Sequence, residues 1–364
     1  MKNILLWLGT LLCVLGSGTA SAAATSETKY VDAATLTLVN KAHPTTQPFH
    51  RVEVADFPDL SKTVRLYYTF STGMAVVFRT DSRAIRARWT TTDRKLGTHM
   101  TGLSQKGMDM YIKRDGKWIF AGIARPGLGV VDHQATIVEQ MDGTEKECLL
   151  YLPLFDELKT LEIGVDADAA IEAAPDPFRR RIVVIGSSIT HGVGLSRPGL
   201  AYPAQLERAT GLEFVNLGAS GQCKMDPFFA HVAAACEADA FLFDCFSNPS
   251  AQLIEERLDS FVRTIRAAHP TKPLIFLQTE LRETRNFNDK IRKYEDEKRA
   301  TSEAGMRTLL RQDKNIYFIN PGMPLGDDHE ATVDGLHPSD LGHDRILEVI
   351  RPQIVKILRK YDIR

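Results

Sequence analysis

The feature that most constrains the fold is a regular alternation of apolar and amphipathic stretches in the C-terminal half of the chain. The apolar stretches have the length and composition of buried strands and lie at 182–186, 213–218, 240–246, 274–279 and 316–320. Helical patterns follow them, at 201–211, 251–269, 288–311 and 339–361. Strands that alternate with helices form a parallel sheet with right-handed crossovers. The pattern therefore predicts an α/β domain with helices packed on the sheet.

The N-terminal half has a different pattern. Between residues 36 and 173 the chain consists of short segments rich in Val, Ile, Tyr, Phe and Thr, such as 63–80, with no helical period. Asp115 and Gly116 separate two of these segments, which is the strongest short-range signal for a hairpin. Repeated short strands of this kind predict a β-sandwich.

The boundaries between the parts of the chain follow from changes in composition. Residues 172–180 contain two prolines and separate a β-sandwich domain at 27–174 from an α/β domain at 179–364. Residues 1–22 have the features of a cleaved signal peptide, because Lys2 is followed by an apolar run and then by small residues. We therefore expect an exported protein, periplasmic or extracellular, that is not inserted in a membrane once the signal peptide is removed.

Composition excludes some classes of partner. The formal net charge of −1 leaves no basic excess to neutralise phosphates, so we expect no nucleic acid. The 10 histidines show no close spacing typical of a zinc site, so we predict neither a metal nor a cofactor. The sequence indicates no particular oligomeric state.

Four cysteines remain after removal of the signal peptide: Cys148, Cys223, Cys236 and Cys245. A strand between Cys236 and Cys245 would hold these two too far apart for a disulfide. Cys223 and Cys245 would both lie at strand ends, so a disulfide between them and a set of free thiols both fit the sequence.

Polar residues follow the predicted strands at the points where ligands bind in parallel sheets. Ser188 follows the first strand. A serine becomes a nucleophile when a histidine takes its proton and an acid orients that histidine, and Asp334 and His337 are three residues apart. The oxyanion formed during ester cleavage needs hydrogen-bond donors. The Ser188 N–H, the Gly221 N–H and the Asn248 amide are our candidates, with Gly218 as the alternative glycine.

These residues, in this order, resemble the SGNH (GDSL-type) hydrolases, whose sequence blocks contribute Ser, Gly, Asn and His. The matching segments are "GSSITHG" with Ser188, "NLGASG" with Gly221, "FSNPS" with Asn248, and "DGLHP" with Asp334 and His337. The resemblance covers residues 179–360. It implies a flavodoxin-like three-layer α/β/α fold for this part of the chain.

The N-terminal half also resembles part of this family. "GMDMY" at 107–111 is similar to the Gly-x-Asp-Leu-Tyr segment of the β domain that precedes one bacterial subgroup of SGNH esterases, with Met110 in place of leucine. We therefore expect the β-sandwich to be jelly-roll-like.

The chain departs from the family pattern in two blocks. Ser187 stands where the family usually has aspartate, and a shift of the block by one residue would make Ser187 the nucleophile instead. In the block that contains Asn248, the usual glycine and the aspartate after the asparagine are absent. His191, Arg282 and Arg285 border the predicted site, and we consider them as substrate-binding residues.

Together these features predict an exported serine esterase that acts through an acyl-enzyme, with O-acetyl groups on carbohydrates as the expected substrate. A lipase or phospholipase, a peptidase or a thioesterase would share the chemistry. A non-catalytic glycan-binding protein on the same scaffold is the alternative from a different class. The strand-end loops contain few large apolar side chains, so we expect a small acyl group.

Overall fold

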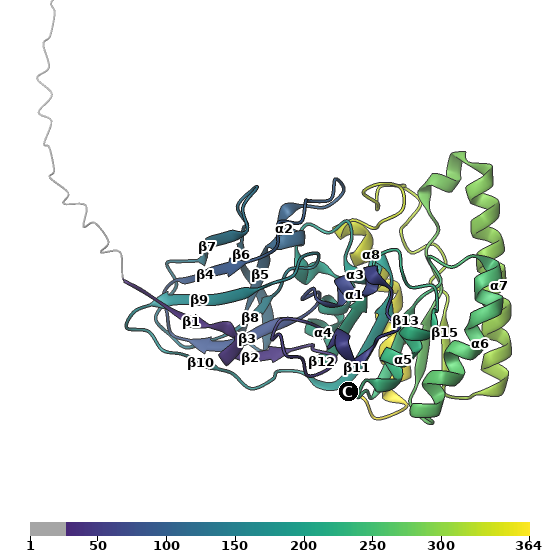
Figure 1. The fold of residues 1–364 in the computed structure, drawn as a ribbon, viewed down its shortest axis with the longest axis horizontal. Coiled ribbons are helices and arrows are strands. Elements are labelled where there is room, and N and C mark those ends of the chain that lie inside the picture. The colour runs from purple at the N-terminus through teal and green to yellow at the C-terminus, as the bar shows by residue number, and fades with distance from the viewer. Residues whose placement is uncertain (1–26) are drawn as a thin grey trace, which may run out of the picture.

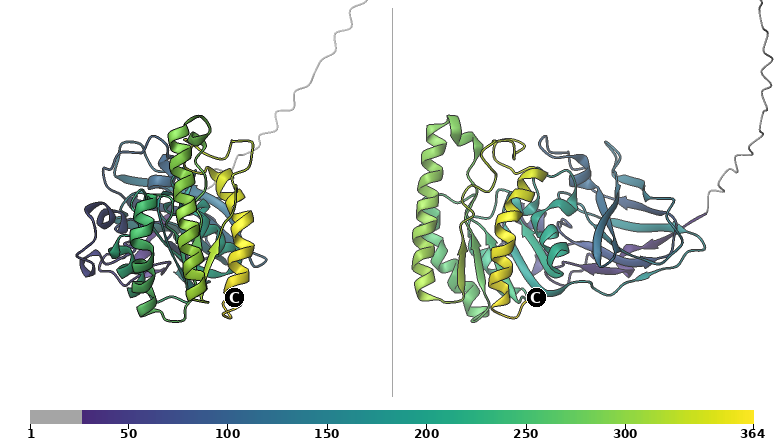
Figure 2. Two further views of the ribbon diagram at one scale, coloured as in Figure 1. Left: turned by 90° about the vertical axis from the view of Figure 1, so that its right-hand side faces the viewer. Right: turned by 180° about the vertical axis from the view of Figure 1, so that it is seen from behind.

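The computed structural model describes residues 27–364, so the predicted signal peptide at 1–22 lies outside the described residues. Figure 1 shows two parts along the long axis of the molecule, a β-rich part and an α/β part, and Figure 2 shows the same arrangement from two other sides. In the described part of the chain, no helix combines the length and the apolarity needed to cross a bilayer.

The N-terminal part is a sandwich of two antiparallel sheets. Its strands are β1 (Thr28–Asp32), β2 (Thr37–Val39), β3 (Ala75–Thr80), β4 (Ile85–Thr90), β5 (Met108–Arg114), β6 (Lys117–Ala124), β7 (Asp132–Val138), β8 (Lys146–Tyr151), β9 (Thr160–Asp166) and β10 (Ile171–Ala173). One sheet has the order β1-β9-β4-β7, and the other has β10-β3-β8-β5-β6 with β2 paired to β3. Alternate residues of both sheets, including Val76, Phe78, Trp89 and Ile163, fill the core between them.

The hairpin predicted at Asp115 and Gly116 joins β5 to β6, and both residues have positive φ angles, 50° and 73°. The expectation of strand structure throughout 63–80 is wrong in its first part, because Lys62–Tyr68 forms helix α1. Ser61 caps this helix by accepting from the Val64 N–H at 3.3 Å. Val64 and Tyr68, one turn apart, are buried, so helical spacing prevailed over a strand-like composition.

The C-terminal part contains five parallel strands: β11 (Arg179–Gly186), β12 (Leu212–Gly218), β13 (Ala240–Asp244), β14 (Leu274–Leu277) and β15 (Ile316–Ile319). Their order is β12-β11-β13-β14-β15. Numbered within this domain, that is the flavodoxin-like order 2-1-3-4-5. The structure thus confirms the predicted fold class, an α/β/α domain after an all-β domain.

Helices cover both faces of this sheet. Helices α4 (Tyr202–Thr210) and α8 (Asp340–Arg359) pack on one face, while α5 (Pro227–Ala235), α6 (Ala251–Ala268) and α7 (Asp289–Gln312) pack on the other. Side chains alternate along β11, so Ile182 and Val184 face the first pair and Val183 and Ile185 face the second set. Helix α7 lies at the end of the molecule away from the sandwich (Figures 1 and 2).

The two parts are joined by polar contacts that come from the "GMDMY" segment. Asp109 in β5 is fully buried and accepts from the Gly199 N–H at 2.7 Å. The Arg197 guanidinium donates to Asp109 and to the Tyr111 hydroxyl. The segment therefore connects the sandwich to the loop that precedes η3 (Pro198–Leu200) and α4.

All four cysteines of the described residues are buried free thiols, which is the second of the two arrangements that the sequence left open.

Candidate active site

The carboxyl ends of β11, β12 and β13 meet where the strand order reverses, because β11 lies between the other two. Ligands bind at such switch points in open α/β sheets. Ser187 follows β11, and Ser188 begins the short helix α3 (Ser188–His191). Gly221 follows β12, and Asn248 follows β13. The fold thus gathers these three strand-end segments, as the sequence predicts.

The two serines after β11 differ in what they contact. The Ser187 hydroxyl donates to Asn248 Oδ1 and accepts from the Gly221 N–H at 3.0 Å. Within residues 27–364 the Ser188 hydroxyl has no hydrogen-bond partner, and Ser188 is 6% exposed against 1% for Ser187. A nucleophile must be free to meet both base and substrate. The geometry therefore favours Ser188, and it gives Ser187 a linking role that the sequence reasoning missed.

The two candidate glycines lie in different surroundings. Gly221 has a φ of +73°, and no atom lies within 4 Å of the place where a Cβ would stand. The Gly218 N–H donates to Asn216 Oδ1 at 2.8 Å, and a Cβ on Gly218 would lie 2.3 Å from the His191 backbone nitrogen. Gly218 is thus a packing position against α3, and Gly221 remains the candidate donor.

Asp334 and His337 form a hydrogen-bonded pair in the loop before α8. Asp334 Oδ2 lies 2.7 Å from His337 Nδ1, and Asp334 Oδ1 accepts from the His337 N–H at 2.8 Å. Burial raises the pKa of Asp334, but hydrogen bonds from His337 and Leu336 outweigh it and lower that pKa below its ordinary value. An ionised Asp334 holds the proton on Nδ1 and leaves Nε2 as the basic nitrogen.

The loop that carries this pair lies against the segment that follows Ser188. A Cβ on Gly194 would stand 3.5 Å from His337 Cβ, and the Ser196 N–H donates to Asp340 Oδ1 at 2.9 Å. Among the described residues, no hydrogen bond joins His337 to Ser187 or Ser188. The structure therefore places Asp334 and His337 beside the segment that begins with Ser188, while no hydrogen bond within residues 27–364 joins His337 to this serine. Such bonds often tighten only when substrate binds.

His99, which the sequence reasoning did not single out, reaches the site from the N-terminal part. Its ring stacks on His337 with centroids 5.5 Å apart. In the part of the chain that the structure describes, His99, Asp334 and His337 form the only group that could hold a metal ion, with ligand atoms within 4.8 Å of one another. An ion held there would occupy the acid and the base, so it would oppose their catalytic use.

His191 is not a substrate-binding residue, which corrects that expectation. It is fully buried, and its ring stacks on Phe155 of the N-terminal part with centroids 3.7 Å apart. Its Nε2 lies 2.8 Å from the Leu154 carbonyl, and its Nδ1 accepts from the Ser220 N–H at 3.2 Å. Burial lowers the pKa of His191 well below its ordinary value, so the ring is neutral. It supports the loop that carries Gly221.

Arg282 and Arg285 line a cavity of about 290 Å³ between η4 (Glu283–Phe287) and the loop at 323–329. None of the proposed catalytic residues lines this cavity. The Arg285 guanidinium pairs with Asp296 at 2.6 Å. The Arg282 guanidinium donates to the Ser247 carbonyl at 3.2 Å, so it contacts the residue next to Asn248. Arg282 thus lies against the Asn248 loop and Arg285 pairs with Asp296, and their role in substrate binding stays a prediction.

Two buried carboxyl groups behind the site were also missed. Asp244, the last residue of β13, accepts from the Thr190 hydroxyl at 2.8 Å, and Glu280 follows β14. Burial raises the pKa of Asp244 to about 6. Burial, together with the charge of Asp244, raises the pKa of Glu280 to about 8. A carboxylate in an otherwise apolar stretch, 240–246, was the available signal for Asp244.

Comparison with known proteins decides the family. Residues 179–355 match the GDSL-like lipase/acylhydrolase family, and residues 28–171 match the GxDLY family, the N-terminus of SGNH-hydrolase-type esterases. A crystal structure of a GDSL-like lipase from Bacteroides ovatus is 47% identical, with a TM-score of 0.89, over 92% of this chain and 98% of that one. The chain belongs to the GDSL-like lipase/acylhydrolase family. No curated protein matched it.

More distant structures share the fold of this GDSL-like acylhydrolase. A salicylyl-acyltransferase from a tetracycline biosynthetic pathway is 20% identical, with a TM-score of 0.67, over 91% of this chain and 97% of that one. A family two carbohydrate esterase from Cellvibrio japonicus is 12% identical, with a TM-score of 0.59, over 92% and 99% of the two chains. These two structures show the fold alone. The family match and the 47% identical structure confirm the resemblance to SGNH hydrolases, and the chain is an esterase or acylhydrolase of this fold.

Proposed function

We propose that this acylhydrolase is an exported serine esterase that removes O-acetyl groups from carbohydrates. The observation that carries the catalytic part is the hydrogen-bonded pair of Asp334 and His337, placed against the segment that begins with Ser188. An acid and base in this arrangement, next to an unbonded serine hydroxyl at a strand end, are what ester cleavage by a serine requires.

In the proposed mechanism, Ser188 Oγ attacks the ester carbonyl carbon while His337 Nε2 accepts the hydroxyl proton. Asp334 stays ionised and stabilises the imidazolium. The negative charge on the carbonyl oxygen is held by the N–H groups of Ser188 and Gly221 and by the Asn248 amide. The tetrahedral intermediate expels the alcohol, which takes the proton from His337, and leaves an acyl-serine. Water, deprotonated by His337, then releases the acid and restores the hydroxyl.

Ser187 would act through the oxyanion donors. Its hydroxyl donates to Asn248 Oδ1, which turns the Asn248 Nδ2 group away from that contact and leaves it free to donate. In the free protein the Gly221 N–H donates to Ser187 Oγ, so substrate must compete for this donor or share it.

Related folds, the strand-end loops and the signal-like segment support the proposed substrate class. Related folds include the carbohydrate esterase from Cellvibrio japonicus and an acetyl xylan esterase from Butyrivibrio proteoclasticus that is 14% identical with a TM-score of 0.57. The strand-end loops offer few large apolar side chains, and each methylene of a longer acyl chain needs buried contact worth about 0.8 kcal/mol. The signal-like segment at 1–22 is consistent with substrates outside the cytoplasm.

One observation favours a lipase as the second candidate. Phe287 in η4 is 101% exposed and Met323 is 64% exposed, and η4 contacts the catalytic loop where the Thr284 N–H donates to the Gly335 carbonyl at 3.3 Å. Exposed apolar side chains beside a site suit a lipid or a long acyl chain.

Acetate release from a panel of O-acetylated glycans, measured with the native protein and with Ser188→Ala, tests the proposal. We expect release by the native protein only. A series of acetyl, butyryl and octanoyl esters separates the candidates: kcat/KM falls along the series for an acetylesterase and rises for a lipase. A protein that binds the glycans but cleaves no ester would be a glycan-binding module instead, and turnover confined to thioesters or peptides would indicate those rivals.

A further inference from the structure

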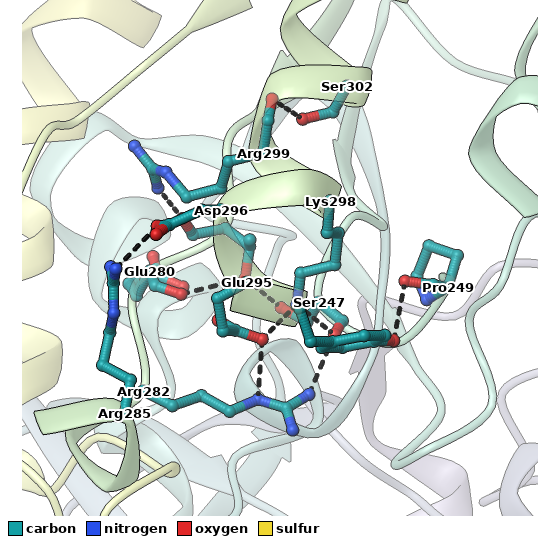
Figure 3. A network of polar contacts seen from close by, with 12 residues as sticks. Ser247, Pro249, Glu280, Arg282, Arg285, Glu295, Asp296, Lys298, Arg299 and Ser302 are labelled. Atoms are coloured by element: carbon teal, nitrogen blue, oxygen red, sulfur yellow. Dashed lines mark hydrogen bonds and ion pairs between the residues drawn. The ribbon is translucent and has the colours of Figure 1, made fainter. Parts of the chain in front are cut away.

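Side chains of α7 and of the segment before α7 bind the backbone of the loop that carries Asn248 (Figure 3). Two cations share the carbonyl of Ser247: Lys298 Nζ donates to it at 3.1 Å and the Arg282 guanidinium at 3.2 Å. On the other side of Asn248, the Tyr294 hydroxyl donates to the Pro249 carbonyl at 3.4 Å. The backbone is therefore held on both sides of the residue that is proposed to bind the oxyanion.

The cations themselves are organised by one buried acid. Glu295 Oε1 lies 2.6 Å from Lys298 Nζ and 3.3 Å from Arg282 Nε. The side chains of Lys298 and Glu295 are only 1% and 0% exposed. Burial lowers the pKa of Lys298, and the attraction of Glu295 opposes that effect. The three charged residues thus form a compact cluster whose hydrogen bonds end on the Asn248 loop.

Such a cluster is a poor device for stability alone. Removing two charges from water has a large cost in free energy, and well-packed apolar residues in place of a buried ion pair are often neutral or stabilising. Glu295 Oε2 is in addition buried without a hydrogen-bond partner. If α7 needed only to pack on the sheet, apolar side chains at 295 and 298 would serve, as Met306 and Leu309 do further along the same helix.

The loop has a specific need for outside support. Its sequence, Ser247-Asn248-Pro249, puts a proline directly after the asparagine, and proline supplies no backbone N–H that could hold the loop. The amide of Asn248 is oriented by Ser187, but that contact does not hold the backbone on which the amide stands. A displacement of about 1 Å in a catalytic group can cost as much as 10²-fold in rate.

We propose that Lys298, held by Glu295 and assisted by Arg282, positions the Asn248 loop so that the amide meets the oxyanion. Lys298 is a positioning residue, because it acts through Asn248 and does not touch substrate. The inference rests on the proposed function, since it requires Asn248 to serve as an oxyanion donor.

The test compares kcat and KM of five variants on a chromogenic acetate. Lys298→Met keeps the length of the side chain and removes the donor. The double variant Lys298→Met/Glu295→Leu removes both fully buried charges and leaves only Arg282, whose side chain is 25% exposed, without its acid. We therefore expect it to fold even if the single variant, which leaves Glu295 without Lys298, does not. Lys293→Met is the matched control, because Lys293 lies on the same helix with its side chain 79% exposed.

We expect both Lys298 variants to lose roughly 10- to 100-fold in kcat with little change in KM, and Lys293→Met to match the native protein. The fourth variant, Asn248→Ala, and the fifth, Asn248→Ala/Lys298→Met, give the decisive comparison. Once Asn248 is absent, removing Lys298 should have little further effect, because the two residues act as one unit.

The outcomes separate this inference from the proposed function. If Asn248→Ala is slow but the ion-pair double variant is folded and as fast as the native protein, the positioning role is wrong and the proposed function stands. The positioning role is also wrong if the losses in kcat caused by Lys298→Met and by Asn248→Ala multiply in the combined variant. If Asn248→Ala keeps native kcat, the oxyanion role of Asn248 fails and this inference fails with it.

Discussion

At the scale of single residues, we propose separate roles for the two adjacent serines. Ser188→Ala and His337→Ala should each lower kcat by roughly 10⁴- to 10⁶-fold, because nucleophile and base act as one unit. Ser187→Ala should cost less than the 10²- to 10³-fold typical of a lost oxyanion donor, because Ser187 only links Gly221 and Asn248. Turnover of a chromogenic acetate measures both. Native-like turnover by Ser188→Ala with loss in Ser187→Ala would exchange the two assignments.

Asn248 provides a second test at this scale. We expect Asn248→Ala to lower kcat by roughly 10²- to 10³-fold with little change in KM, since an oxyanion donor acts in the transition state. Steady-state kinetics with circular dichroism as a folding control measure this. A change confined to KM would make Asn248 a substrate-binding residue instead.

At the scale of elements, the "GMDMY" segment of β5 fastens the sandwich to the loop before η3. Removing Arg197 leaves the Asp109 carboxylate buried without its cation, and breaking such a pair costs about 3–5 kcal/mol. We therefore expect Arg197→Ala to lower the free energy of unfolding by about that amount in urea denaturation. Arg263→Ala is the matched control, because the side chains of its pair with Asp259 are 74% and 60% exposed. It should have no measurable effect.

At the scale of the whole molecule, the buried carboxyl groups predict how stability depends on pH. Glu280 has a folded-state pKa of about 8, raised by burial and by Asp244, against about 4.3 in an unfolded chain. The folded protein therefore binds the proton more tightly. Its contribution to stability is complete below the unfolded pKa and is lost as the pH rises through the folded pKa.

It follows that the protein should be less stable at about pH 8.5 than at about pH 5.5. Glu280→Gln should raise the midpoint of thermal unfolding at the higher pH and change it little at the lower one. Scanning calorimetry at both values measures this, with the exposed Glu256→Gln as the control. An equal shift of the midpoint at both pH values would show that Glu280 is not the group responsible.

Local sequence determined much of this protein. The alternation after residue 180 predicted the parallel sheet, and the helices α4, α6, α7 and α8 lie where their periodic patterns indicated. Asp334 and His337 are three residues apart, so their hydrogen bond needed only one turn of chain. Helix α1 was missed because its composition is that of a strand. Only the burial of Val64 and Tyr68, which lie one helical turn apart, distinguishes it.

Only the tertiary structure decided which residues of distant segments contact one another. The contact of His99 with His337, the burial of His191 against Phe155, and the bonds from Lys298 and Arg282 to Ser247 each join residues more than thirty positions apart. Periodicity and turn chemistry indicate only on which face of its own helix or strand a residue lies. Which residue meets that face depends on how the sandwich and the helices pack. Only this packing places His191 where it supports the Gly221 loop and Lys298 where it contacts the Asn248 loop.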